Sequence, residues 1–242
     1  MEQGIGARYQ RETAYSRASL KGGSQDWANQ PETYKRYPQA TRTELEQPDP
    51  RGGAPLWRVL ATRRSVRDYN DTPLRLGEVS QLLWASTGIT LSAEGYGLRT
   101  APSAGGLYPI ETYLSVQAEG ELPSGLYHYD IAGHALELLR PGDHRSQVAH
   151  AALDQPLAYR APLVVLWSAV FARTTWKYRD RGYRYVYMEA GHVAQNLALA
   201  ALGLGLVTCQ IAAIFDDEAN ALLDVDGRQE SVIYMSIVGH EA

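Results

Sequence analysis

The residues with the clearest chemical potential are three arginines and a serine that lie within five positions of one another. The segment reads Arg63-Arg64-Ser65-Val66-Arg67-Asp68-Tyr69. Forked guanidinium donors suit phosphate oxygens and stay charged when water is removed. We therefore predict an anion site made by Arg63, Arg64, Ser65 and Arg67. A solvated run of charge at a helix end is the alternative interpretation.

A loop from Arg99 to Pro109 is the second candidate, because it is rich in small residues and turn formers. Its alanine and glycine residues would let backbone amides approach a ligand closely. Combined with an upstream arginine site for phosphate, the loop indicates a flat ring held against the backbone. An ordinary long turn is the alternative.

Two polar residues lie on the most apolar predicted helix, and neither forms a recognisable metal site. His192 has no histidine or carboxylate at ligand spacing except Glu189, so a core or interface histidine is the favoured interpretation. Glu189 would need a partner if it is buried, and nearby arginines could supply one. No metal site is predicted.

Residue spacing and the cysteine count exclude several other kinds of site. Gly203-Leu204-Gly205 follows a helix and lacks the spacing of a dinucleotide fingerprint. Ser103 has no flanking glycine at the offset that a nucleophile elbow requires. The single Cys209 excludes an intrachain disulfide and a cysteine-based zinc cluster.

Length and charge set the broad class. The chain has 242 residues and a net charge of -4, so it offers no global basic field for nucleic acid or anionic membranes. It contains no apolar run of roughly 18 residues that could span a bilayer. Residues Met1 to Gln10 lack the apolar core of a signal peptide. These features predict a cytoplasmic protein that binds neither nucleic acid nor membrane.

Two regions differ in composition. Residues 1–54 are polar and rich in proline and glycine, yet Tyr15, Trp27, Tyr34 and Tyr37 interrupt them. Because disordered segments are poor in such residues, we expect an arm pinned on the domain or on a partner subunit, with a floppy leader as the alternative. Residues 55–242 form the predicted domain.

Helices and strands are mixed along the domain rather than strictly alternating, which predicts the α+β class. Apolar spacing and end signals predict helices at about 55–63, 76–87, 144–153, 186–202 and 216–223. Alternation and β-branched runs predict strands at about 111–117, 125–130, 135–140, 162–170, 207–213 and 231–238.

Three motifs in register resemble the nitroreductase-like flavoproteins. They are Arg63–Tyr69, Ala101-Pro-Ser-Ala-Gly-Gly-Leu-Tyr-Pro109 and Ala201-Leu-Gly-Leu-Gly205. The segment Trp176-Lys-Tyr-Arg…Arg184-Tyr…Glu189-Ala-Gly-His-Val-Ala-Gln-Asn196 is more similar still to the SagB-type dehydrogenases. The arm also matches that family, in Asp26-Trp-Ala-Asn-Gln-Pro and Tyr34-Lys-Arg-Tyr-Pro38.

The resemblance implies a central mixed antiparallel sheet flanked by helices, with FMN bound at the interface of an intertwined homodimer. It implies that Arg63, Ser65 and Arg67 hold the phosphate and the pyrimidine edge of FMN. The remaining FMN contacts that it implies are Pro102, Ser103, Ala104 and Gly105 from the second subunit, together with Gln195, Cys209, Gln210 and Ile211.

The resemblance also implies a reaction: the two-electron oxidation of an azoline on a peptide or carrier-bound substrate, beside other biosynthetic enzymes. Lys177 and Tyr178 match a Lys-Tyr pair that removes the carbon-bound proton. A lysine desolvated among arginines and aromatic rings has a lowered pKa and can act as the base. A surface cation beside a packing ring is the alternative. An NAD(P)H-dependent nitro or quinone reductase and a non-catalytic flavin-binding subunit are the alternative functions.

Overall fold

The computed structural model describes residues 4–17, 26–93 and 96–242. The helices are α1 (Ile5–Glu12), α2 (Leu56–Thr62), α3 (Leu76–Thr87), α4 (Arg145–Ala151), α5 (Pro156–Arg160), α6 (Phe171–Tyr178), α7 (Gly182–Gly203) and α8 (Asp216–Leu223), with single turns η1 (Trp27–Asn29), η2 (Ala104–Gly106) and η3 (Arg179–Arg181). The strands are β1 (Thr41–Glu44), β2 (Ile89–Ala93), β3 (Tyr96–Arg99), β4 (Ile110–Val116), β5 (Gly125–Asp130), β6 (Ala135–Pro141), β7 (Leu163–Val170), β8 (Val207–Ile211) and β9 (Glu230–Gly239).

Seven strands form one sheet in the order β1-β6-β5-β4-β7-β9-β8, and each neighbouring pair is antiparallel. Strand β7 lies between β4 and β9, with Val165 opposite Leu114 of β4 and Leu166 opposite Met235 of β9. Its run of Leu, Val and Ala is buried on both faces, because helices cover both sides of the sheet. The predicted α+β class and antiparallel sheet are confirmed.

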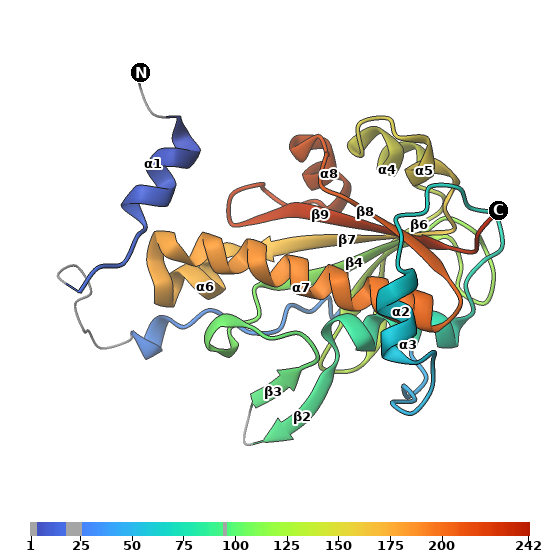
Figure 1. Ribbon diagram of the computed structural model, residues 1–242, viewed down its shortest axis with the longest axis horizontal. Helices are drawn as coiled ribbons and strands as arrows, with labels where there is room; N and C mark the ends of the chain where they lie inside the picture. The colour runs from blue at the N-terminus through green and yellow to red at the C-terminus, as the bar shows by residue number, and fades with distance from the viewer. Residues whose placement is uncertain (1–3, 18–25, 94–95) are drawn as a thin grey trace.

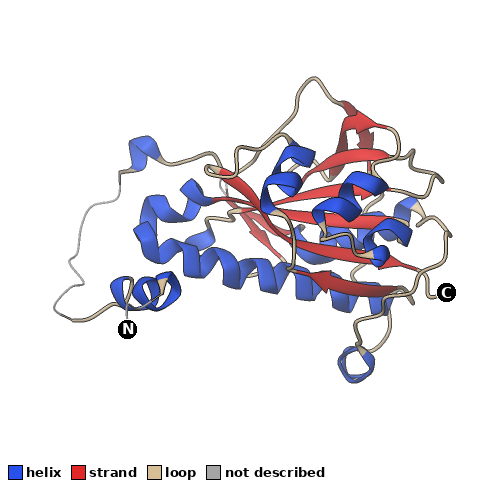
Figure 2. Ribbon diagram, turned by 90° about the horizontal axis from the view of Figure 1, so that it is seen from above, coloured by secondary structure: helices blue, strands red, loops and turns tan. Residues whose placement is uncertain are grey.

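The helices divide between the two faces of the sheet, as Figures 1 and 2 show. Helices α3 and α7 pack on one face, where Leu82, Trp167 and Leu197 belong to one apolar cluster. Helices α4, α5 and α8 lie on the other face, where Val148 and Ile237 belong to a second cluster. The sheet therefore separates two cores.

Helix α7 runs along the molecule from α6 at one end to α2 and α3 at the other (Figure 1). It begins at Gly182, four residues before the predicted start, because the polar residues Tyr183 to Tyr185 disguise its first turn. Val193 and Leu197 face the core as expected. No helix in the described ranges 4–17, 26–93 and 96–242 is both long and apolar enough to span a bilayer.

The sequence did not reveal α1, α5, β1 or the β2–β3 hairpin. Strand β1 is short and mostly exposed, and it joins the sheet only through pairing with β6, for example Thr43 with Leu136. Neither alternation nor a β-branched run marks such an edge strand. Its place depends on backbone hydrogen bonds to a distant segment.

The described part of the arm from residue 26 to residue 44 lies against the domain of the same chain. The rings of Trp27 and Trp176 meet edge to face, with centroids 5.5 Å apart. The indole N–H of Trp176 donates to the Asp26 carbonyl at 2.9 Å, and the Tyr37 N–H donates to a Glu137 carboxylate oxygen at 3.1 Å. Aromatic and backbone contacts thus fix this segment.

Arg173 on α6 joins the arm, the sheet and the small-residue loop through one buried guanidinium. Its Nη1 lies 2.6 Å from Glu111 Oε1 on β4, and both side chains are almost fully buried. It also donates to the Tyr108 carbonyl at 3.1 Å and to the Glu32 carbonyl at 2.7 Å. A buried charge so fully hydrogen-bonded fixes the position of α6.

The Glu111 carboxylate has a second cationic neighbour. His128 lies between Glu111, at 3.0 Å, and Glu137, at 2.7 Å. Burial alone would lower the pKa of His128, but the two carboxylates raise it above its ordinary value. Both ring nitrogens of His128 thus lie within hydrogen-bond distance of a carboxylate oxygen.

Arg173→Met is expected to lower the free energy of unfolding by about 3–5 kcal/mol, because it leaves the Glu111 carboxylate buried with one cation fewer. Urea titration measures this loss. The double variant Arg173→Met with Glu111→Gln should recover part of it, since no carboxylate is then left short of a partner.

The matched control is Arg51→Met. Arg51 also pairs with a carboxylate, that of Asp49 at 3.2 Å, but its side chain is 89% exposed. A change below about 0.5 kcal/mol is expected for such a surface pair. Equal losses in the two single variants would contradict the role given to Arg173.

Candidate active site

The predicted catalytic pair lies against the small-residue loop. Gly105 and Gly106 have φ values of 70° and 66°, in the region that glycine adopts without strain. A Cβ at Gly105 would lie 2.9 Å from the Tyr178 hydroxyl and 3.1 Å from Lys177 Nζ. The fold therefore brings together two segments more than 70 residues apart in the sequence, and a lysine amine and a phenol meet at exposed backbone.

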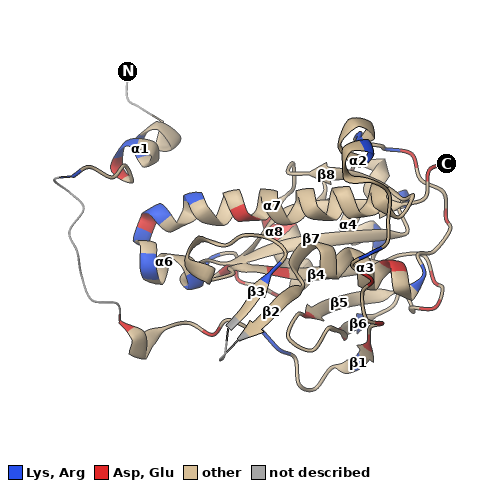
Figure 3. Cartoon of the chain, turned by 60° about the horizontal axis from the view of Figure 1, so that its bottom comes forward, with Lys and Arg blue, Asp and Glu red and all other residues tan. Residues whose placement is uncertain are grey.

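Ring packing holds Lys177 and Tyr178 in place at the end of α6. The rings of Tyr178 and Tyr185 are almost perpendicular, at 84°, with centroids 4.9 Å apart. Phe171, at the start of α6, packs on Tyr183 at 4.9 Å. Figure 3 shows Lys and Arg gathered along α6 and the adjacent end of α7. The pair thus lies in a cationic and aromatic setting.

Ser103 turns its hydroxyl into the protein. The Ser103 oxygen accepts the Tyr108 N–H at 2.8 Å, and the hydroxyl hydrogen-bonds the carboxyl of Glu189. Tyr108 has a positive φ of 46°, so these bonds hold a strained residue at the end of the loop. Ser103 therefore fixes the conformation of the loop from its buried side.

Glu189 is a buried carboxyl beneath the loop, with 4% of its surface exposed. Burial raises its pKa to about 7, against the opposing effects of the Ser103 hydrogen bond and the charges of Arg99 and Arg173. The arginines expected as partners therefore act on Glu189 through their charge, whereas its hydrogen bond is with Ser103.

Arg99 is the second buried arginine near Glu189. Its guanidinium lies 4.3 Å from the Tyr108 ring centroid and 5.5 Å from that of Tyr34. Its Nε and Nη2 have no hydrogen-bond partner among the residues that the structure describes. Burial lowers the pKa of Arg99. Sequence analysis missed the roles of Arg99 and Arg173, because a lone arginine carries no signal of burial.

The arginine segment lies elsewhere, beside β8. The Val66 N–H donates to the Thr208 carbonyl at 3.1 Å, and Ser65 bridges to the same residue. Burial raises the pKa of the Cys209 thiol, while Arg67 and a hydrogen bond with Ser65 oppose that change. The fold thus brings Arg63–Arg67 next to the predicted segment Cys209–Ile211.

The cations of this segment are not neutralised by carboxylates. Within the described part of the chain, no ion pair involves Arg63, Arg64 or Arg67. Arg64 donates to the Arg63 carbonyl at 2.7 Å, and Arg67 makes a long 3.4 Å contact with the Ser65 carbonyl. Guanidinium donors therefore remain for an anion.

The two groups of predicted residues lie toward opposite ends of α7. Glu189 contacts the loop near one end, whereas Gly203 at the other end accepts a hydrogen bond from Ala54, just before α2. They are fourteen positions apart, which corresponds to about 21 Å of helix. Gln195 lies between the two groups on an exposed part of α7. One chain therefore does not bring all the predicted site residues together.

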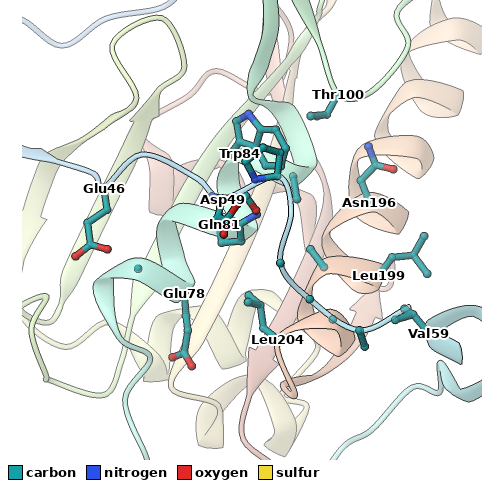
Figure 4. A pocket seen from close by; sticks show the side chains of 18 of the residues that line it. Glu46, Asp49, Val59, Glu78, Gln81, Trp84, Thr100, Asn196, Leu199 and Leu204 are labelled. Carbon is teal, nitrogen blue, oxygen red and sulfur yellow. Dashed lines mark hydrogen bonds between the residues drawn. The ribbon is translucent and has the colours of Figure 1, made fainter. Parts of the chain in front are cut away.

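A hollow of about 710 Å³ opens between α2, α3, the loop at residues 46–54 and the last turns of α7 (Figure 4). Trp84, Leu199 and Leu204 give it apolar walls, and Glu46 and Asp49 lie at its edge. None of the predicted site residues lines it. Its walls supply no lysine or tyrosine.

Glu189→Gln is expected to change how stability depends on pH. Between pH 4.5 and about 7 the folded protein keeps a proton on Glu189 that the unfolded chain releases, so stability falls as pH rises through this window. The glutamine variant does not titrate, so above pH 7 it should be more stable than the wild type by about 1–3 kcal/mol.

Urea unfolding between pH 5 and pH 8 measures the difference. At pH 5 the wild type and Glu189→Gln should converge, and the exposed control Glu119→Gln should follow the wild type throughout. If Glu189→Gln were less stable at pH 8, Glu189 would be an ionised partner of Arg99 instead.

The chain matches the family model described as the nitroreductase family over residues 60–240. It is 41% identical over 167 residues to a Methanocaldococcus jannaschii protein that carries a nitroreductase name, covering 69% of this chain and 83% of that one. It is 27% identical over 222 residues to the trifolitoxin operon protein TfxC of Rhizobium leguminosarum, covering 85% of this chain and 62% of TfxC.

Solved structures show the same architecture. A nitroreductase-type protein from Anabaena variabilis superposes with a TM-score of 0.81 at 29% identity, covering 98% of this chain but 46% of that chain. A chain of the Escherichia coli microcin synthetase McbBCD complex with truncated pro-MccB17 bound superposes with a TM-score of 0.64 at 20% identity. The match covers 98% of this chain and 92% of that chain. A Desulfovibrio desulfuricans protein of nitroreductase type in complex with FMN superposes with a TM-score of 0.56 at 20% identity. The match covers 78% of this chain and 87% of that chain.

These matches confirm the superfamily indicated by the arginine segment, the small-residue loop and the end of α7. The family model extends from within α2 to the last residues of β9, so it includes both groups of predicted site residues. The chain belongs to the nitroreductase family.

Proposed function

We propose that this protein is an FMN-dependent dehydrogenase that oxidises an azoline or similar heterocycle on a peptide or carrier-bound substrate, in the manner of the SagB-type enzymes. The observation that carries the proposal is the contact of Lys177 and Tyr178 with the Gly105 backbone. A reductase of small nitro compounds needs no protein base at a carbon-bound proton. The similarity to TfxC supports a place in natural-product biosynthesis.

The residues present fit FMN. Arg63, Ser65 and Arg67 supply phosphate donors with no competing carboxylate in the described part of the chain. Tyr178 and Lys177 fill the space beside Gly105, whereas a Cβ at Gly106 would meet no atom within 4 Å, which leaves the backbone at Gly106 open to a flat ring. When bound, FMN supplies a two-electron acceptor for a hydride. The FMN named for the Desulfovibrio structure supports this choice of cofactor.

The protein's own task is to move a proton. Oxidation of a thiazoline to a thiazole removes a hydride from one ring carbon and a proton from its neighbour. Lys177 Nζ accepts that proton, and the electron pair of the broken C–H bond becomes the new ring double bond. Tyr178 holds the ring nitrogen by a hydrogen bond from its hydroxyl. Ser103 and Glu189 keep the loop in place beneath the reacting ring.

We further propose that the complete site forms between two copies of the chain. The separation of the two groups along α7 supports this, because the arginine segment of one copy would complete the loop of the other. A second copy would cover exposed apolar side chains such as Trp57 of α2, which is 80% exposed, and Met188 of α7, which is 59% exposed. His192, which is exposed on α7, would belong to this interface and not to a core.

Mixed dimers test the shared site. Arg67→Ala should weaken FMN binding by about 1.5–3 kcal/mol, and Lys177→Ala should remove turnover with FMN retained. A dimer with one copy of each variant has one site with both residues intact if Arg67 and Lys177 come from different chains. It should therefore recover about half of wild-type turnover per dimer.

Differently tagged copies, purified through both tags, supply the mixed dimer. The control is a mixed dimer in which one copy carries both substitutions and the other is wild type, which has no intact site under the shared arrangement. An active control together with an inactive mixed dimer would place both groups in one chain.

Lys177→Ala separates proton removal from electron transfer. Oxidation of a thiazoline peptide should fall by about 10²- to 10⁴-fold, as is typical for loss of a general base. The yellow FMN absorbance and the rate of dithionite reduction should stay unchanged, because no carbon-bound proton moves there. The oxidation rate of Tyr178→Phe should fall by a comparable factor if the hydroxyl holds the substrate, and by less if the ring only packs.

The alternative is an NAD(P)H-dependent nitro or quinone reductase, which the nitroreductase name of the 41%-identical relative favours. Steady NADPH oxidation with a nitroarene, no reaction with thiazoline peptides and full activity in Lys177→Ala would establish that alternative.

A further inference from the structure

Arg179 lies directly after the Lys177–Tyr178 pair, between α6 and α7, in an unusual backbone conformation. Its φ is 51° and its ψ is -142°. This combination lies outside the left-handed helical well and is open chiefly to glycine, which has no Cβ. An arginine held there is strained, and strained residues gather at functional sites.

The backbone of Arg179 is held by two hydrogen bonds, from its own N–H to the Thr175 carbonyl and from the Gly182 N–H to its carbonyl, but its side chain makes none in the described chain. Arg179 is exposed, and among the described residues no hydrogen bond or ion pair involves its guanidinium. Its neighbours differ in this respect. Arg181 lies 4.3 Å from the Tyr15 ring centroid and donates to the Thr13 carbonyl, and Arg184 also donates to Thr13. Arg179 alone of the three has its donors directed to no residue of the described chain.

The surroundings of Arg179 are positive in a protein whose net charge is -4. Four cations and one acid, Asp180, lie in residues 177–184. The cations are Lys177, Arg179, Arg181 and Arg184. No described carboxylate forms an ion pair with any of them, because Arg181 and Arg184 bond neutral oxygens. Figure 3 shows this group at the end of the molecule where α6 meets α7.

We propose that Arg179 is a substrate-recognition residue whose guanidinium binds a carboxylate of an acidic peptide while the azoline of that peptide lies at Lys177 and Tyr178. The inference rests on the proposed function, and it adds a chemical class of substrate. Guanidinium recognises a carboxylate through two parallel hydrogen bonds, which gives position as well as affinity. This role explains why an arginine is kept where glycine would be unstrained.

The test uses the full-length holoprotein and two fluorescein-labelled peptides. One carries a thiazoline flanked by two aspartates, and the other has asparagines in their place. Arg179→Gly removes the charge and the strain together, and Arg179→Asn removes the charge but leaves a side chain at the strained position. Arg228→Asn, at an exposed turn, is the matched control.

Arg179→Gly should bind the aspartate peptide about 5- to 20-fold more weakly in fluorescence anisotropy at low salt, and Arg179→Asn should behave similarly. Both should bind the asparagine peptide within about twofold of wild type. FMN content should be unchanged, and the melting temperature of Arg179→Gly should equal or exceed that of wild type, because the strain is gone.

Unchanged affinity for the aspartate peptide, or equal losses for both peptides, would overturn the inference. So would loss of FMN from the Arg179 variants, since the guanidinium would then serve the cofactor. Turnover separates this inference from the proposed function. If wild type binds the aspartate peptide through Arg179 but oxidises neither peptide, the azoline assignment fails while the recognition role stands. If wild type oxidises both peptides equally and Arg179→Gly matches it, only the recognition role fails.

Discussion

One buried guanidinium determines where the reactive groups lie. Arg173 contacts a carboxylate of the sheet, the carbonyl of Tyr108 and the carbonyl of Glu32 in the arm. Lys177 follows one helical turn later on α6, so the position of its amine depends on that guanidinium. A charge taken out of water is held only by a complete set of partners, which makes the arrangement geometrically demanding. The arm, the sheet and the loop are thereby fixed relative to the proposed base.

The small-residue loop at residues 99–109 is supported by polar groups that are costly to bury. Glu189, Ser103 and Arg99 lie under it, where a well-packed protein would ordinarily place apolar side chains. Ser103 and the backbone of Arg99 hydrogen-bond Tyr108, which has a positive φ. The same buried groups therefore affect both the stability of the protein and the geometry of the loop, so a substitution at Glu189 changes both.

Helix α7 separates the two groups of predicted site residues within one chain. Its first turns carry the aromatic contacts of Tyr178 and its last turns pack near the arginine segment. A helix is rigid along its axis, so the distance between the halves is fixed by its length. In the proposed dimer, two copies with α7 antiparallel would place the arginine segment of each copy beside the small-residue loop of the other. A twofold interface forms both such sites at once.

The sequence by itself determined the elements whose signals are local. The bounds of α3 at Leu76–Thr87 follow from its apolar stripe and Gly88, and β7 follows from its β-branched run. The arginine segment and the small-residue loop indicated the family, because each motif is contiguous. The Lys177–Tyr178 pair came from the same kind of resemblance.

Tertiary structure alone decided the properties that depend on distant partners. Whether Arg99, Arg173 and Glu189 are buried follows from how the sheet, α6 and α7 pack, and no nearby residue in the sequence reports it. The strained conformation of Arg179 likewise belongs to the junction of α6 and α7, where its backbone bonds Thr175 and Gly182. Periodicity and turn residues are encoded over a few positions, whereas burial, pKa and backbone strain are set by contacts across the whole chain.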